Sequence, residues 1–231
     1  MKKYSLFCIM LLACLCASAA SPYCVLSDNT LTFYYDENMS SHTTGTNYDL
    51  VYSGHYPKWT AKASLVRTVV FDSSFADALP TDGSYWFYNM SNLTSIQGLS
   101  NLNTSNMTLM SGMFQSCSKL AYLDLRSFDT KNVMRMNSMF NQCSSLTTLL
   151  LDNWDVSHVK NMNSMFYGCY NLTSLDVGKW KTDELINMGY LFYQCNKLET
   201  IDVGGWDVSK VANCHYAFFG CKSVKELDVA N

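Results

Sequence analysis

The strongest constraint on the fold of this chain is a phenylalanine that recurs every 26 residues, with a cysteine three positions after each one. The two rows are Phe114, Phe140, Phe166, Phe192 and Phe218, and Cys117, Cys143, Cys169, Cys195 and Cys221. A fixed period of this length is typical of a solenoid, in which each repeat buries its apolar side only against its neighbours. Because most of this region is committed to a periodic core, the period makes an enzyme less expected.

Further apolar rows predict the local structure within each repeat. The stretch Leu172–Val177 has the LxxLxL form of a leucine-rich repeat, and the alternation of Leu175 and Val177 favours a strand. The stretch Met162–Phe166 has apolar residues at i, i+3 and i+4, which is one face of a short helix. Asn161 stands where it can cap that helix. We therefore expect an α/β fold, a leucine-rich-repeat solenoid with a parallel sheet and short helices, capped by an N-terminal β-rich module.

Three segments are expected along the chain. Residues 1–20 form a signal peptide, residues 21–84 a β-rich N-terminal cap module, and residues 85–231 a solenoid of about five and a half coils. The first coil is a looser copy of the repeat and has one extra residue around Gln97–Leu99. Strand-like stretches in the cap module predict that it shares the sheet of the solenoid. These stretches are Tyr23–Leu26, Thr30–Tyr35 and Ser64–Phe71, with a turn at Ser27–Asn29.

The N-terminus has the pattern of an export signal. Two lysines precede an apolar run, Tyr4–Cys16, which small residues 17–20 follow. The run is too short to be a permanent membrane span. Cleavage after this segment is favoured and predicts an extracellular or cell-surface protein. The stretch Leu11–Cys14 also fits a lipoprotein box, in which Cys14 would be acylated and hold the protein at a membrane.

The cysteine row is best explained as packing. Each cysteine stands at the same point of successive coils, and Met90 occupies this position in the first repeat. A thioether replaces a buried thiol in a core, but it cannot replace half a disulfide or a thiolate ligand. Disulfides or zinc are the alternatives, although the closely spaced cysteine pairs of a zinc site are missing.

Charge and residue spacing point away from nucleic acids and catalysis. The formal net charge is −3, and no basic patch interleaved with aromatics is present, so no nucleic-acid partner is expected. His158 and His215 occupy different registers of the repeat, and no Ser-His-Asp or Cys-His signature is found. We expect no catalytic residue, no metal ligand and no cofactor.

The repeat F-x-x-C-x-x-L-x-x-L-D-L/V-x-x-W-D-V-S-x-V-x-x-M-x-x-M resembles the 26-residue repeat of the BspA-like leucine-rich-repeat surface proteins of bacteria. Thr30–Asp36, Val69–Ala76 and Trp86–Phe87 resemble the lead-in of that family, so nearly the whole mature chain is covered. The resemblance implies export or surface display. It also implies adhesion to host matrix and plasma proteins such as fibronectin and fibrinogen, or to other bacteria.

Outward positions beside the strands are the candidate interaction surface. They carry an acidic column and two variable positions: Asp124, Arg126, Asp152, Asp176, Asp202 and Asp228. A second acidic row follows the aromatic positions and contains Asp129, Asp155 and Asp207. Like charges on neighbouring strands repel each other and need an offset. Either the carboxylates accept hydrogen bonds from turn amides and serines of the adjacent coil, which we favour, or calcium bridges them.

Two classes of function fit this surface. The first is a protein-interaction or adhesion module whose partner is a protein, such as a host extracellular-matrix or bacterial surface protein. The second is a carbohydrate-binding or structural surface protein that uses the row Trp154, Trp180 and Trp206, although such rows are more often core packing. The chain stops directly after a strand, so self-association through an uncapped C-terminal coil is also expected.

Overall fold

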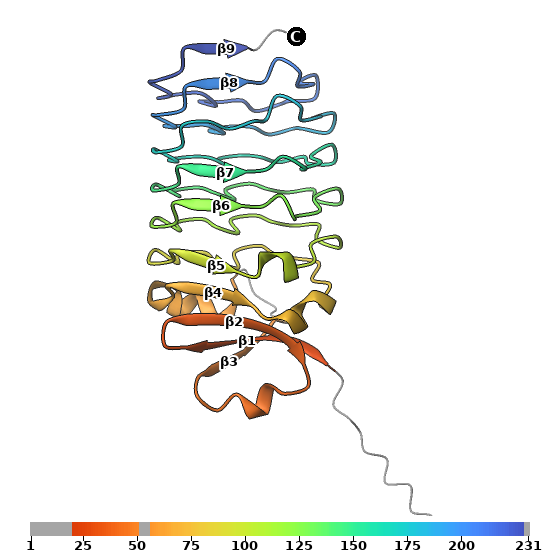
Figure 1. Ribbon diagram of the computed structural model, residues 1–231. Helices are drawn as coiled ribbons and strands as arrows, with labels where there is room; N and C mark the ends of the chain where they lie inside the picture. Colours follow the sequence, from red (N-terminus) through yellow and green to blue (C-terminus); the bar gives the residue numbers. More distant parts are fainter. Residues whose placement is uncertain (1–19, 51–55, 229–231) are drawn as a thin grey trace, which may run out of the picture.

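The computed structural model describes residues 20–50 and 56–228 of the chain. It shows an N-terminal β-sheet from which a tall stack of coils continues along one axis (Figure 1). The expected signal peptide, apart from Ala20, lies outside the described residues, and so does the alternative lipidation site Cys14.

One five-stranded sheet joins the N-terminal segment to the first repeat. Its strands are β1 (Ser21–Ser27), β2 (Thr30–Asp36), β3 (Thr46–Asp49), β4 (Thr68–Phe71) and β5 (Ser95–Gln97). Their order is β3-β1-β2-β4-β5. β1 is antiparallel to β2 and β3, whereas β4 and β5 continue the sheet in parallel. The N-terminal segment therefore shares its sheet with the first coil, as the sequence predicted.

The N-terminal hairpin follows its turn chemistry. Asp28 and Asn29 have φ of 45° and 66°, as a two-residue hairpin turn between twisted strands requires. The predicted strand Ser64–Phe71 is too long, because it begins only at Thr68. Its first residues end a 3-10 helix that buries Trp59 against the sheet.

All helical elements among the described residues are short 3-10 helices. They are η1 (Met39–Ser41), η2 (Lys58–Leu65), η3 (Ser73–Asp77) and η4 (Leu99–Asn101). They lie between the N-terminal strands and after β5, and none lies in the later coils. From residue 102 to residue 228 the described chain contains only short strands, bridges and turns.

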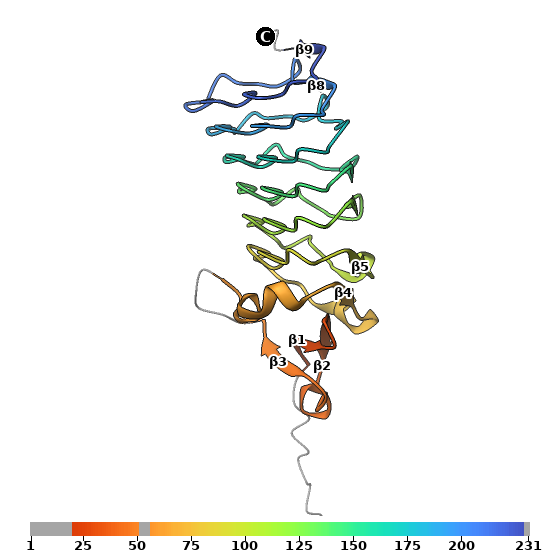
Figure 2. The same ribbon diagram turned by 90° about the vertical axis from the view of Figure 1, so that its left-hand side faces the viewer.

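The remaining strands lie one above the other (Figure 1), and the stack continues along the same edge as β4 and β5 (Figure 2). They are β6 (Tyr122–Asp124), β7 (Thr148–Leu150), β8 (Thr200–Asp202) and β9 (Glu226–Asp228). β6 pairs only with β7, and β8 only with β9, both in parallel and with a register of one repeat. A second ladder of isolated parallel bridges links successive coils, at Asp82, Leu109, Arg135, Asn161, Asn187 and Asn213.

The expected α/β leucine-rich-repeat solenoid is therefore wrong as a fold class. The described residues contain no α-helix, and the strands form three separate sheets instead of one continuous parallel sheet. What the 26-residue period specifies is a stack of coils joined by short β-pairs and by hydrogen-bonded turns.

The predicted helix Met162–Phe166 is a ladder of turns. The Ser164 N–H donates to the carbonyl of Gly189 in the next coil at 2.8 Å, instead of to a residue four positions earlier. The Met165 N–H donates to the Met162 carbonyl, three positions earlier, at 3.1 Å. Asn161 does accept a hydrogen bond from the backbone N–H of Asn163, at 2.9 Å, but in a turn and not as a helix cap. Because every second backbone N–H donates to the next coil instead of to the residue four positions earlier, an α-helix cannot form here.

Left-handed residues at two fixed points of every coil produce this ladder. They form two columns: Tyr85, Gly112, Ser138, Ser164, Tyr190 and Tyr216, and Asn89, Ser116, Gln142, Gly168, Gln194 and Gly220. All have φ between 54° and 81°. A positive φ at the third residue of a four-residue turn is typical of a type II turn. Because of these turns, two neighbouring side chains point into the core and the next two point outward. The buried residues therefore have the same i, i+3, i+4 spacing as one face of a helix.

A single hydrophobic core runs along the axis of the stack. The phenylalanine row stacks ring on ring, with centroids 5.7 Å apart for Phe114 and Phe140 and 5.3 Å apart for Phe166 and Phe192. At its N-terminal end the same core includes Phe33 of β2. Every coil therefore depends on its neighbours for burial.

One extra residue in the first repeat interrupts the outer sheet between β5 and β6. Gly98 follows β5 with φ of 68°, and a side chain there would overlap the Phe71 carbonyl. The chain then bulges outward as η4 (Leu99–Asn101). Asn101 Nδ2 fixes the bulge by donating to the same Phe71 carbonyl at 3.0 Å.

We expect the substitution Gly98→Ala to lower the free energy of unfolding by about 2 kcal/mol, through left-handed strain and overlap with the Phe71 carbonyl. Chemical denaturation followed by circular dichroism measures the change. Gly204→Ala is the control, because Gly204 has no positive φ, and should change stability by less than about 0.5 kcal/mol. Equal effects of the two substitutions would contradict this account of the bulge.

Candidate interaction surface

The interruption after β5 opens a groove of about 620 Å³ on the strand edge of the stack. Its lining comes from β5, η4, β6 and the two following turns: Ile96, Leu99, Ser100, Tyr122, Leu123, Asp124, Arg126, Ser127 and Asn153. Its volume is in the range of pockets that hold ligands.

Tyr122 and an ion pair supply the polar and aromatic groups of the groove. Tyr122 is 57% exposed, which is high for a tyrosine. Arg126 donates to both oxygens of Asp124, from Nη2 at 2.7 Å and from Nε at 3.0 Å. These bonds lower the pKa of Asp124 below its usual value. A pair this exposed adds little stability, but its two-point geometry fixes the plane of the guanidinium at the groove wall.

The structure brings together only part of the predicted surface. Asp124 and Arg126 line the groove, and the charge of Asp152 in the next coil acts on Arg126. Asp176 is exposed two coils beyond Asp124, in a coil without a strand. Asp202 lies in β8 and accepts a hydrogen bond from the Gly204 N–H at 3.3 Å.

The last predicted surface residue, Asp228, stands opposite Asp202 in β9. Because Leu150 interrupts the column and the sheet is broken between β7 and β8, the acids do not form one continuous surface. The sequence reasoning missed Ile96, Leu99 and Tyr122 as groove residues. The signal that could have revealed them is the extra residue at Gln97–Leu99, which breaks the period.

The second acidic row is held by hydrogen bonds, but the donors belong to its own coil and not, as we expected, to the adjacent coil. Asp129, Asp155 and Asp207 each accept a bond from the backbone N–H two residues later, at 3.2, 3.0 and 2.9 Å. The pKa of each carboxyl is lowered mainly by the side chain of the same donor residue, Lys131, Ser157 or Ser209, and further by these backbone bonds. Among the described residues, no group of three or more His, Cys, Asp or Glu could hold a metal ion.

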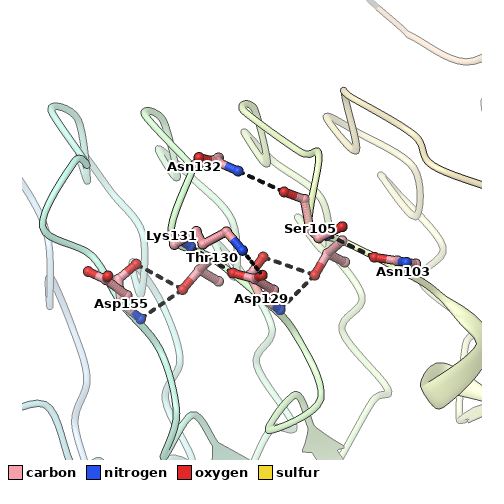
Figure 3. A network of polar contacts seen from close by, with 8 residues as sticks. Asn103, Ser105, Asp129, Thr130, Lys131, Asn132 and Asp155 are labelled. Atoms are coloured by element: carbon pink, nitrogen blue, oxygen red, sulfur yellow. Dashed lines mark hydrogen bonds and ion pairs between the residues drawn. The ribbon is translucent and has the colours of Figure 1, made fainter.

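A buried threonine joins each of these turns to the previous coil (Figure 3). Thr130 Oγ1 donates to the Asp155 carbonyl at 2.8 Å and accepts from the Asp155 N–H at 2.9 Å. Thr104 makes the same two bonds to Asp129, at 3.0 and 2.8 Å. One hydroxyl thus satisfies both backbone groups of an aspartate in the neighbouring coil.

The cysteine row is a column of packed thiols, as predicted. Its first four members are fully buried, and the last is half-buried. Each Sγ lies within hydrogen-bond distance of a phenylalanine carbonyl in the preceding coil, between 3.1 and 3.2 Å, as Cys169 does with Phe140. Burial raises the pKa of Cys143 to about 12 and that of Cys221 to about 11. These thiols are therefore protonated at neutral pH.

The tryptophan row belongs to the core and offers no exposed stacking surface. Trp154, Trp180 and Trp206 are 7, 5 and 0% exposed, and their rings stack on one another. The indole N–H of Trp154 donates to the Leu125 carbonyl at 3.0 Å, and that of Trp206 to the Val177 carbonyl at 2.9 Å. The core-packing interpretation of this row is confirmed.

The C-terminal coil is the place of the predicted self-association. β9 forms the outer edge of the β8–β9 sheet among the described residues, and residues 229–231 lie outside them. The self-association stays a prediction. Within the described ranges, no helix has the length and apolar character needed to cross a membrane.

The stacked coils make this chain a repeat protein (Figure 1), and one family model matches it over these coils. A family model described as "Mycoplasma protein of unknown function, DUF285" matches residues 81–174 and again residues 147–230. The chain belongs to this family. No curated protein and no solved structure matches it.

We expect Thr130→Val to lower the free energy of unfolding by about 2 kcal/mol, because it leaves the N–H and C=O of Asp155 without their partner. Urea denaturation measures the loss. Thr147→Val is the matched control, since Thr147 is exposed and donates only one bond, to the Ala121 carbonyl. A loss no larger than that of the control would show that the cross-coil hydroxyl is not structural.

We expect iodoacetamide to label Cys214 in the native protein much faster than the cysteine row. Cys214 is exposed and can react. The reagent cannot reach the buried residues, and burial also keeps their thiols protonated: Cys117, Cys143, Cys169 and Cys195. Peptide mapping by mass spectrometry, with and without denaturant, measures labelling at each position. Fast labelling of Cys143 without denaturant would contradict the packed row.

Proposed function

We propose that this protein is an exported bacterial surface protein that binds a protein ligand in the groove between η4 and β6. The observation that carries the proposal is the groove itself, which exists because the first repeat breaks the period. Export is supported by the sequence of residues 1–20. Host matrix proteins are candidate ligands because the repeat resembles that of BspA-like surface proteins.

The groove has the composition of a protein-binding hot spot. Tyrosine and arginine are enriched among the residues that contribute most to protein–protein affinity. Tyr122 stands half-exposed beside Leu99, and the Asp124 carboxylate fixes Arg126 before a ligand arrives. A side chain that is already ordered loses less entropy on binding. A ligand with an apolar side chain for the floor and a carboxylate for Arg126 fits this arrangement.

We expect Tyr122→Ala and Arg126→Ala each to weaken ligand binding by about tenfold. Surface plasmon resonance with immobilised fibronectin and fibrinogen measures the affinities. Tyr193→Ala is the control, because Tyr193 is another partly exposed tyrosine, outside the groove. Full binding by both groove variants would place the site elsewhere, and a lack of binding to either protein would remove matrix proteins as the ligand.

A further inference from the structure

The turn ladder presents a second surface that contains no charged side chain. It consists of the outward residues of six equivalent segments, 84–91, 111–118, 137–144, 163–170, 189–196 and 215–221, and we call it the turn face. The chain has 16 basic and 19 acidic residues, and all of them lie outside these segments. The turn face carries instead tyrosine, asparagine, glutamine and serine, with His215 in its last coil.

Aromatic rings gather on the last three coils of the turn face. Tyr167, Tyr193 and Phe219 form one stacked column, with centroids 4.7 and 5.2 Å apart. Tyr190 and Tyr216 form a second column beside it, with centroids 5.5 Å apart. Phe219 is 54% exposed and Tyr216 is 49% exposed. The two columns also contact each other, with centroids 5.6 Å apart for Tyr190 and Tyr193.

Amide side chains continue the turn face from the aromatic rings toward the N-terminal coils. Gln115 and Asn141 occupy the repeat position that an aromatic residue such as Phe219 occupies in the last three coils. Gln142 and Gln194 occupy the following position. The side chains of Gln115, Asn141, Gln142 and Gln194 are half-buried and form no hydrogen bond to another described residue. They therefore keep donors and acceptors for a ligand, because each amide offers both.

We propose that the turn face binds an uncharged oligosaccharide. A sugar ring places its apolar C–H groups against aromatic rings and its hydroxyls, which both donate and accept, against amide groups. A protein ligand brings charged side chains. On this face they would lose their water without gaining an oppositely charged partner, which costs free energy. A neutral glycan brings no such cost. The face repeats once per coil, about every 4.8 Å, so it matches a ligand that is itself a chain of repeated units.

Affinity electrophoresis of the full chain in gels that contain neutral polysaccharides tests the proposal. The probes are galactomannan, xyloglucan and mixed-linkage β-glucan, with polygalacturonate as the charged comparison. We expect retardation by at least one neutral polymer and equal retardation at low and high salt, because no charges are involved. Tyr193→Ala should weaken it by about tenfold. Tyr193→Phe, which keeps the ring, should weaken it far less.

The groove variant Tyr122→Ala is the matched control and should bind the polysaccharides like the unaltered chain. Far-UV circular dichroism and the thermal midpoint establish that each variant is folded. No retardation in any neutral gel would overturn the proposal, as would retardation that Tyr193→Ala leaves unchanged. If Tyr193→Ala instead abolishes binding to a protein ligand, the turn face binds protein and the glycan assignment is wrong. The groove is tested separately, because its variants do not change the turn face.

Discussion

The structure depends on backbone amides that donate to the next coil instead of to their own. Met162, Ser164 and Phe166, for example, donate to the carbonyls of Asn187, Gly189 and Leu191. The intervening amides close turns within the coil, so nearly every polar backbone group of this segment is paired at the core. The arrangement requires two left-handed residues in each coil. Most of them are not glycine, which costs free energy at every such position and is offset only when neighbouring coils are present.

Side chains complete the same set of cross-coil bonds. Thr182 donates to the Asp207 carbonyl, Cys169 to the Phe140 carbonyl and Trp206 to the Val177 carbonyl. Each of these three side chains has an apolar body and one polar hydrogen. Each one can therefore fill the core and, at the same time, donate a hydrogen bond to a carbonyl of an adjacent coil. This explains why cysteine and tryptophan hold fixed places in the repeat beside residues that are purely apolar.

The sequence predicts the period and the inward rows, because burial demands the same residue types at the same place in each coil. Its strand prediction at Leu172–Val177 is wrong, since that coil contains no strand. Leu123, Leu149 and Ile201 are inward strand residues as expected. The helix prediction at Met162–Phe166 failed because turns with a left-handed third residue reproduce helical spacing. Nothing in the hydrophobic pattern separates the two, and glycine occupies only three of the twelve left-handed positions in these two columns. The sequence identified Asp124 and Arg126 as surface residues, but their groove depends on the geometry of one inserted residue.

The inward residues of each coil determine how the coils stack on one another. The outward residues can therefore form two independent surfaces. Positions such as Tyr122 and Arg126 lie on the strand edge, and positions such as Tyr193 lie on the turn ladder, with the buried phenylalanine and cysteine rows belonging to the core between them. Effects of substitutions on surfaces without shared contacts add independently. No charged residue lies in the turn-face segments, whereas Asp124 and Arg126 line the groove, so the two surfaces suit ligands of different charge. The stacked coils can therefore carry both the proposed protein-binding groove and the proposed glycan-binding turn face without a conflict between them.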